Sequence, residues 1–123
     1  SNMNKKEGNS RPALEVELHR KLTTIIENKM EDPRCRSISI VWRLYINSCL
    51  YLASTHEGES VYLSTAKKAF YRGLRHCAGC KDYLVSSIIS LRSVGLLTTA
   101  EIDQILEVMN KRGLLLRFVS ASY

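Results

Sequence analysis

The sequence lacks any apolar run that approaches the roughly 18 residues required for a membrane-spanning helix. It contains only two prolines and four cysteines, and 123 residues are enough for one domain to bury a core without a disulfide framework. No strand pattern separates its apolar segments. These absences argue against a transmembrane segment and a disulfide-stapled fold, and they favour a single helical domain.

The beginning of the chain lacks a secretory signal. Ser1-Asn2-Met3 is typical of the remnant of a cleaved tag, and the following residues are polar, with glycine and serine. We therefore expect residues 1–10 to be a tag remnant and a disordered lead. Residues 11–118 are expected to form a helical-repeat domain, followed by a tail at residues 119–123.

Catalytic patterns are also missing. The sequence has no Gly-rich phosphate loop, no Ser-His-Asp order and no carboxylate pair in an apolar setting, so nothing supplies a nucleophile with its base. Cys77 and Cys80 follow His76, but no second Cys or His pair accompanies them, as a structural zinc site requires. We expect no enzymatic activity, no metal and no cofactor, and we interpret the two cysteines as small apolar residues at a helix end.

Apolar residues recur at helical spacing in five segments. The predicted helices cover residues 12–30, 37–54, 60–76, 81–94 and 98–112. The apolar positions of the first are Leu14, Leu18, Leu22, Ile25 and Ile26. Pro12 suits its first turn, and Ser37 is a candidate N-cap of the second helix. The sequence therefore predicts an all-α fold of antiparallel helical hairpins, stacked as a short α-solenoid of about five helices.

Local signals mark the ends of the later helices. Thr98 and Glu101 have the spacing of a capping box, in which hydroxyl and carboxylate satisfy each other's backbone amides. Gly95 and Gly113 suit the left-handed conformation that often ends a helix. These signals predict the boundaries of the fifth helix.

Aromatic and small residues are arranged for close packing of two helices. Large aromatic side chains on one helix of a hairpin need small residues on the next, so that the backbones can approach. Trp42 and Tyr45 are the aromatic residues here, and Ala66, Ala69 and Gly73 are the small ones.

Residues 42–45 and 66–74 resemble the half-a-tetratricopeptide (HAT) repeat, whose first helix carries Trp-x-x-Tyr. The resemblance implies a HAT/TPR-like solenoid. The residues that would carry the repeat are Trp42, Tyr45, Ala66, Ala69, Phe70, Gly73 and Leu74. Lys67 and Arg72 also occupy positions that match the repeat. Tyr71, Gly73 and Ala78 depart from the family pattern, although Gly73 keeps the small size that its position needs.

The order of the Trp42 hairpin and of a later helical segment, residues 101–109, is similar to the C-terminal region of the nuclear-RNAi-defective-2 family. This resemblance implies a nuclear, non-enzymatic adaptor in RNA silencing and RNA surveillance, linked to the exosome. It also implies protein partners in nuclear RNA processing. The helicase contact of that family lies in a segment without a counterpart here, so no helicase-binding residue is assigned.

Residues 60–81 contain no acidic residue, within a chain of net charge +6. The candidate partner-binding or RNA-binding residues in this stretch are Lys67, Lys68, Tyr71, Arg72, Arg75 and Lys81. Phosphates and an acidic peptide would suit this surface equally, and a merely solvated helix face is the third interpretation.

The end of the sequence is apolar. Its candidate self-association residues are Leu114, Leu115, Leu116 and Phe118, which would leave an exposed apolar patch unless they fold back or meet a partner. A homodimer formed through this tail, or through an uncovered apolar face of the first helix, is a further hypothesis.

Overall fold

The computed structural model describes residues 2–55 and 59–113 and is all-α over these ranges, which confirms the predicted fold class. Its helices are α1 (Asn2–Lys29), α2 (Pro33–Arg36), α3 (Ser39–Ala53), α4 (Glu59–His76), α5 (Lys81–Ser93) and α6 (Thr99–Lys111). Five of them match predicted helices, and the short α2 was not predicted. Within the described ranges, every helix is too short or too polar to span a lipid bilayer.

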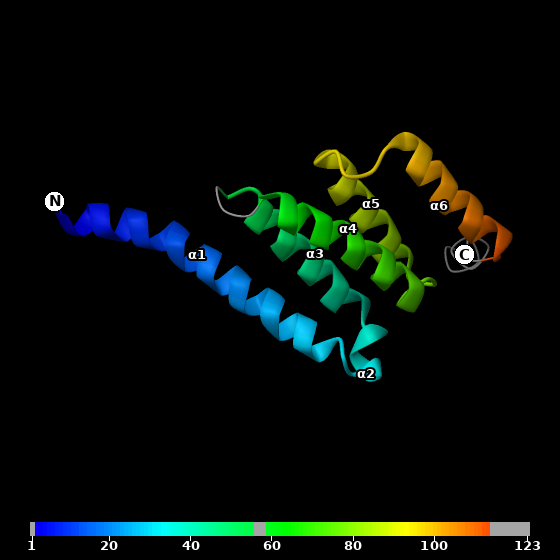
Figure 1. Cartoon of the computed structure of the whole chain (residues 1–123), viewed down its shortest axis with the longest axis horizontal. Helices are drawn as coiled ribbons and strands as arrows, with labels where there is room; N and C mark the ends of the chain where they lie inside the picture. The colour runs from blue at the N-terminus through cyan, green and yellow to red at the C-terminus, as the bar shows by residue number, and fades with distance from the viewer. Residues whose placement is uncertain (1, 56–58, 114–123) are drawn as a thin grey trace.

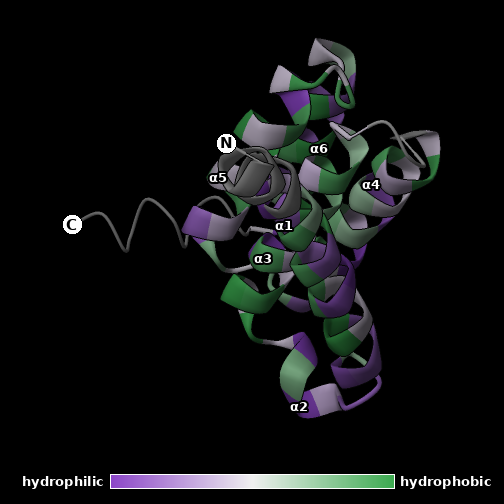
Figure 2. Ribbon diagram, turned by 90° about the vertical axis from the view of Figure 1, so that its left-hand side faces the viewer, coloured by the Kyte–Doolittle hydropathy of each residue, from purple (hydrophilic) through white to green (hydrophobic). Residues whose placement is uncertain are grey.

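The helices form a short row of hairpins, with α1 and α6 at opposite ends (Figure 1). Helix α3 packs most extensively against α4, then against α1 and α5. The N-terminal half of α1 extends beyond α3 (Figure 1). Apolar and hydrophilic segments alternate along the helices, and α2 is mostly hydrophilic (Figure 2). Each larger helix therefore turns one side toward its neighbours and another toward solvent.

The α3–α4 hairpin closes around Trp42, which is fully buried. A Cβ atom added to Gly73 would lie 2.9 Å from Cγ of Trp42 and 2.6 Å from Cζ of Tyr83 on α5. The indole and the phenol therefore occupy the space that the missing side chain leaves. This confirms the predicted contact between an aromatic residue and a small one, and it adds Tyr83. The other predicted hairpin residues that are buried are Tyr45, Ala66, Ala69 and Phe70, while Leu74 is half-buried.

The turn between α1 and α3 differs from the prediction. Ser37 does not cap α3: it follows the last residue of α2, and the residue before α3 makes no side-chain capping bond. The carboxylate of Asp32 instead accepts a bond from the Arg34 backbone N–H and caps α2. Nε1 of Trp42 donates to the Arg36 carbonyl oxygen at 2.7 Å, which joins α2 to the buried hairpin.

Helix α1 also begins earlier than predicted, at Asn2 rather than near Pro12. The predicted disordered lead is thus helical from residue 2 onward. Proline lacks an N–H and removes one hydrogen bond from the helix, but the chain continues as a helix on both sides of Pro12.

The predicted apolar face of α1 is only partly the face that packs. Ile26 is buried and Leu22 half-buried, whereas Leu14, Leu18 and Ile25 are each 55% exposed. A different side of α1 meets α3 and forms hydrogen bonds with it. Leu14, Leu18 and Ile25 form what we call the α1 stripe.

Polar contacts fix the orientation of α1 on α3. Nδ1 of His19 lies 3.0 Å from the hydroxyl of Ser48, and the His19 ring stacks on Tyr51 with centroids 4.1 Å apart. The hydroxyl of Tyr45 donates to Oε1 of Glu27 at 2.5 Å. Because burying a polar group without a partner is costly, these bonds add to the burial of Ile26 and Met30 in favouring this orientation of α1.

The predicted boundaries of α6 are confirmed. Thr98 and Glu101 form the capping box, with the Glu101 backbone N–H 3.1 Å from Oγ1 of Thr98. Gly95 and Gly113 have φ angles of 77° and 73°, which only glycine adopts without strain.

Candidate interaction surfaces

The predicted basic surface of α4 divides into parts with different roles. Arg72 lies over the Trp42 ring, with Cζ 5.2 Å from the ring centroid, so its guanidinium contributes a cation–π contact to the hairpin. Lys67 turns toward α6, where Nζ lies 2.9 Å from Oε2 of Glu101. Lys68 and Arg75 are exposed and pair with no residue that the structure describes. The stretch is therefore not one uniform basic face.

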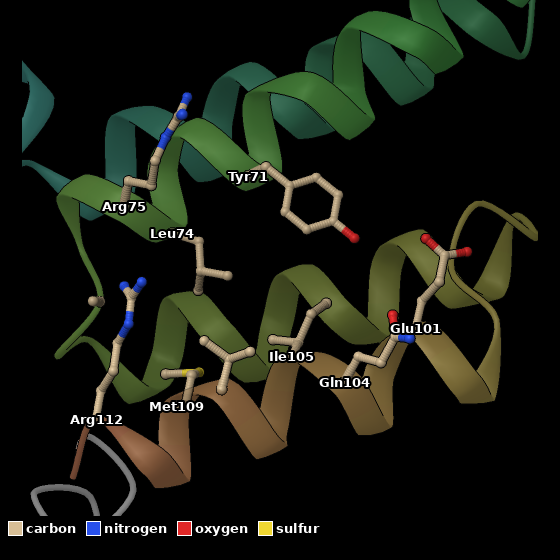
Figure 3. Close-up of a pocket in the computed structure, with 10 residues that line it drawn as sticks. Tyr71, Leu74, Arg75, Glu101, Gln104, Ile105, Met109 and Arg112 are labelled. Carbon is tan, nitrogen blue, oxygen red and sulfur yellow. The ribbon is translucent and has the colours of Figure 1, made fainter.

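Two further residues were predicted to belong to the basic surface, Tyr71 and Lys81. Tyr71 is 37% exposed, and its side chain faces α6 (Figure 3). Lys81 is the exposed first residue of α5 and takes part in interactions there. The predicted tail residues lie outside the described residues.

An open groove separates α4 from α6, with a volume of about 400 Å³. Leu74 of α4 and Ile105 and Met109 of α6 point into the space between the two helices (Figure 3). Ala78 and Val108 complete this apolar floor. The groove exists because the α6 backbone approaches its neighbours less closely than the other helices approach theirs.

An ion pair closes one end of the α4–α6 groove. Glu101 contacts Lys67 and also accepts bonds from the Thr98 backbone and hydroxyl at 3.3 Å. The Lys67 ammonium, followed by the Thr98 backbone N–H, lowers the pKa of the Glu101 carboxyl below its usual 4.5. The same contact raises the pKa of Lys67. Both groups are therefore charged at neutral pH. Glu101, the one acid among the described residues that line the groove, is neutralised by Lys67.

Two arginines lie at the other end of the α4–α6 groove. Arg112 follows the last residue of α6, and Arg75 lies in the last turn of α4. In Figure 3 the Arg112 side chain rises toward α4, while the guanidinium of Arg75 points away from the groove. Neither arginine forms an ion pair with another residue in the described part of the chain.

The cysteines are thiols within the helical core or at its edge. Cys77 is buried, and Sγ lies 3.5 Å from the Arg36 carbonyl oxygen, which matches its interpretation as a small core residue. Burial, with a smaller contribution from the charge of Glu27, raises the pKa of Cys49 to about 12. Among the described residues, no group of three or more His, Cys, Asp or Glu side chains lies close enough to hold a metal ion.

Comparisons with protein-family models, with curated proteins and with solved structures gave no match. The resemblance to HAT repeats therefore rests on residues 42–45 and 66–74 alone.

Sequence reasoning missed the α6 side of the groove. Gln104, Val108 and Arg112 lie beside the buried positions Ile105 and Met109. One signal was available in the sequence. Val108 is apolar but lies next to Met109, outside the regular spacing of the predicted buried residues, so it could have indicated an exposed apolar position. The pairing of Lys67 with Glu101 carried no such signal, since 34 positions separate these residues in the chain.

Proposed function

We propose that this chain is a non-enzymatic protein-interaction scaffold, the C-terminal HAT-repeat part of a nuclear adaptor in RNA silencing and RNA surveillance. The observation that carries the interaction role is the α1 stripe. The nuclear and RNA-silencing assignment is supported by the resemblance of the Trp42 hairpin and of residues 101–109 to that family.

The α1 stripe is a coherent surface. Around a helix with 3.6 residues per turn, Leu14, Leu18 and Ile25 fall within about 40° of one another. Each side chain is 55% exposed, and charged residues such as Glu17 and Lys21 lie beside them. Exposed apolar patches with a polar border are found at protein-interaction sites. The partner we propose is a protein of nuclear RNA processing.

The hairpin core supports this role indirectly. Trp42, Gly73 and Tyr83 fix α3, α4 and α5 as one packed unit, on which α1 is held by hydrogen bonds to Ser48 and Tyr45. A rigid support presents the stripe in a single geometry, which lowers the entropy lost on binding.

A pull-down from nuclear extract tests the proposal. We would immobilise the full chain, treat the extract with RNase, and compare the wild type with a variant that carries Leu14→Glu, Leu18→Glu and Ile25→Glu. The matched control carries Val61→Glu and Ile89→Glu, at positions 64% and 63% exposed on α4 and α5. We expect RNA-processing proteins to be retained by the wild type and the control and lost by the stripe variant. Equal retention by all three, or no retained protein, would contradict the proposal.

An RNA-binding module is the second candidate, favoured by Lys68 and Arg75, which are exposed cations without an ion-pair partner among the described residues. Its test is Lys68→Glu with Arg75→Glu, because reversing Arg72 would also remove the contact with Trp42. Binding to a single-stranded oligonucleotide should weaken in this variant and with added salt. Affinity that changes with neither would eliminate the RNA-binding candidate.

A further inference from the structure

The α4–α6 groove combines an apolar floor with two arginines at one end that have no ion-pair partner among the described residues. Its volume of about 400 Å³ lies within the range of ligand sites, roughly 300–1,000 Å³. Leu74, Ile105 and Met109 point into it (Figure 3), and they are aliphatic or thioether side chains, which accept apolar groups of varied shape. The floor therefore suits a few apolar side chains of a ligand.

The charge at the arginine end exceeds what the helices themselves neutralise. Each helix C-terminus carries about half a negative elementary charge, so the ends of α4 and α6 together offset about one of the two positive charges of Arg75 and Arg112. A net charge of about +1 remains there. At the other end, Glu101 is already paired with Lys67. A ligand carboxylate is therefore favoured at the arginine end.

One polar side chain along the groove is suited to a peptide backbone. The hydroxyl of Tyr71 interacts with Glu101, whereas Gln104 lies on the α6 wall beside it. Gln104 makes no hydrogen bond with any residue that the structure describes. Its amide both donates and accepts, which matches the N–H and C=O groups of an extended chain.

We propose that the α4–α6 groove binds a short acidic–apolar peptide segment of a partner protein. Its aliphatic or aromatic side chains lie on Leu74, Ile105 and Met109, and a neighbouring carboxylate pairs with Arg112. Arg75 joins that carboxylate by rotating its side chain toward the groove. This proposal rests on the interaction role above but concerns a surface separate from the α1 stripe.

Other ligand classes fit the groove less well. RNA recognition normally uses aromatic side chains on which bases stack, and Tyr71 is the one aromatic residue among the described residues that line this groove. A second copy of the chain carries the same net charge of +6, which opposes its approach to two arginines. An acidic segment gains from that charge.

A peptide-display selection tests the proposal. Random twelve-residue peptides would be selected on the immobilised full chain, and the best peptide would be measured by fluorescence anisotropy. We expect the enriched peptides to combine Asp or Glu with two or more Leu, Ile, Met or Phe residues. Affinity should fall at least tenfold in Val108→Glu and at least threefold in Arg112→Glu.

Matched controls separate the groove from general effects of charge. Val85 on α5 is 45% exposed, compared with 48% for Val108, and Arg92 is an exposed arginine in the last turn of α5. Val85→Glu and Arg92→Glu should leave affinity within twofold of wild type. All four positions are exposed, and thermal unfolding followed by circular dichroism verifies that the variants fold.

Three results would overturn the proposal. They are enrichment of peptides without acidic residues, affinity that Val108→Glu leaves unchanged, and failure to enrich any peptide. In that last case, self-association that Val108→Glu abolishes would assign the groove to a second copy. Because the α1 stripe is intact in every groove variant, loss of peptide binding with retained extract proteins would leave the scaffold role standing. Peptide binding to the groove without any stripe-dependent partner would support the groove proposal and contradict the proposed role of the α1 stripe.

Discussion

Gly73 is the residue on which the central hairpin most depends. A methyl group at this position would overlap the Tyr83 phenol and approach the Trp42 indole, and both rings are fully buried. Tyr83 is fixed further because its hydroxyl donates to the Phe70 carbonyl oxygen at 2.8 Å. Alanine in a helix interior is intrinsically favoured over glycine by about 1 kcal/mol. Overpacking typically costs about 1–3 kcal/mol, which is the larger effect.

We therefore predict that Gly73→Ala lowers the free energy of unfolding by up to about 2 kcal/mol, as measured by urea denaturation. Gly79→Ala is the control, because a Cβ at Gly79 meets no atom within 4 Å. An increase in stability for Gly73→Ala would show that the rings can move aside and that the helices do not pack as described.

At the scale of elements, α6 is tied to α4 by the contact between Glu101 and Lys67. The pKa of Glu101 is lowered in the folded chain, so its contribution to stability is fully present above the unfolded value near 4.5. That contribution is lost as pH falls through the lowered folded value. The raised pKa of Lys67 contributes stability that is lost only when the pH rises into the alkaline range.

We predict that wild type loses more stability than Glu101→Gln when the pH is lowered from about 7 to about 3. Glutamine keeps the spacing of the capping box but removes the titrating carboxyl. Urea denaturation of both proteins at each pH measures the difference. Parallel losses in the two proteins would show that the pair between α4 and α6 does not form in solution.

At the scale of the whole molecule, the α1 stripe and the net charge of +6 act against each other in self-association. Apolar contact through the stripe favours a dimer, while charge repulsion opposes it and is screened by salt. We predict that the mass measured by light scattering rises above 14.0 kDa as concentration and salt increase. Leu18→Glu should abolish the rise. A constant 14.0 kDa under all conditions would remove the homodimer hypothesis.

The fold was largely predictable because its signals are local. The capping box at Thr98 and the glycines at 95 and 113 set helix ends through their own backbones. The match of Trp42 with Gly73 was also predictable, because a large side chain on one helix packs closely against the next helix only where that helix carries a small residue. The orientation of α1 was not. Its apolar spacing included Leu14 and Leu18, but the buried side carries Ile26 and Met30 together with the His19 bond to Ser48.

The candidate site was predictable only in part. The basic stretch of α4 was visible in the sequence, but the separate roles of Lys67 and Arg72 depend on α6 and α3, which lie next to α4 only in the folded chain. The α4–α6 groove has no linear signature, because its walls come from segments 71–78 and 101–112. Packing distance between helices is a property of the assembled fold.

The chain contains a single tryptophan, and its indole is enclosed at the junction of α2, α3 and α4. Tryptophan fluorescence therefore comes from one known place in the molecule. Its emission lies at a shorter wavelength while water is excluded from the indole. Emission should move to longer wavelength when the central hairpin opens and the indole meets water. The protein thus carries an intrinsic optical probe of its own core.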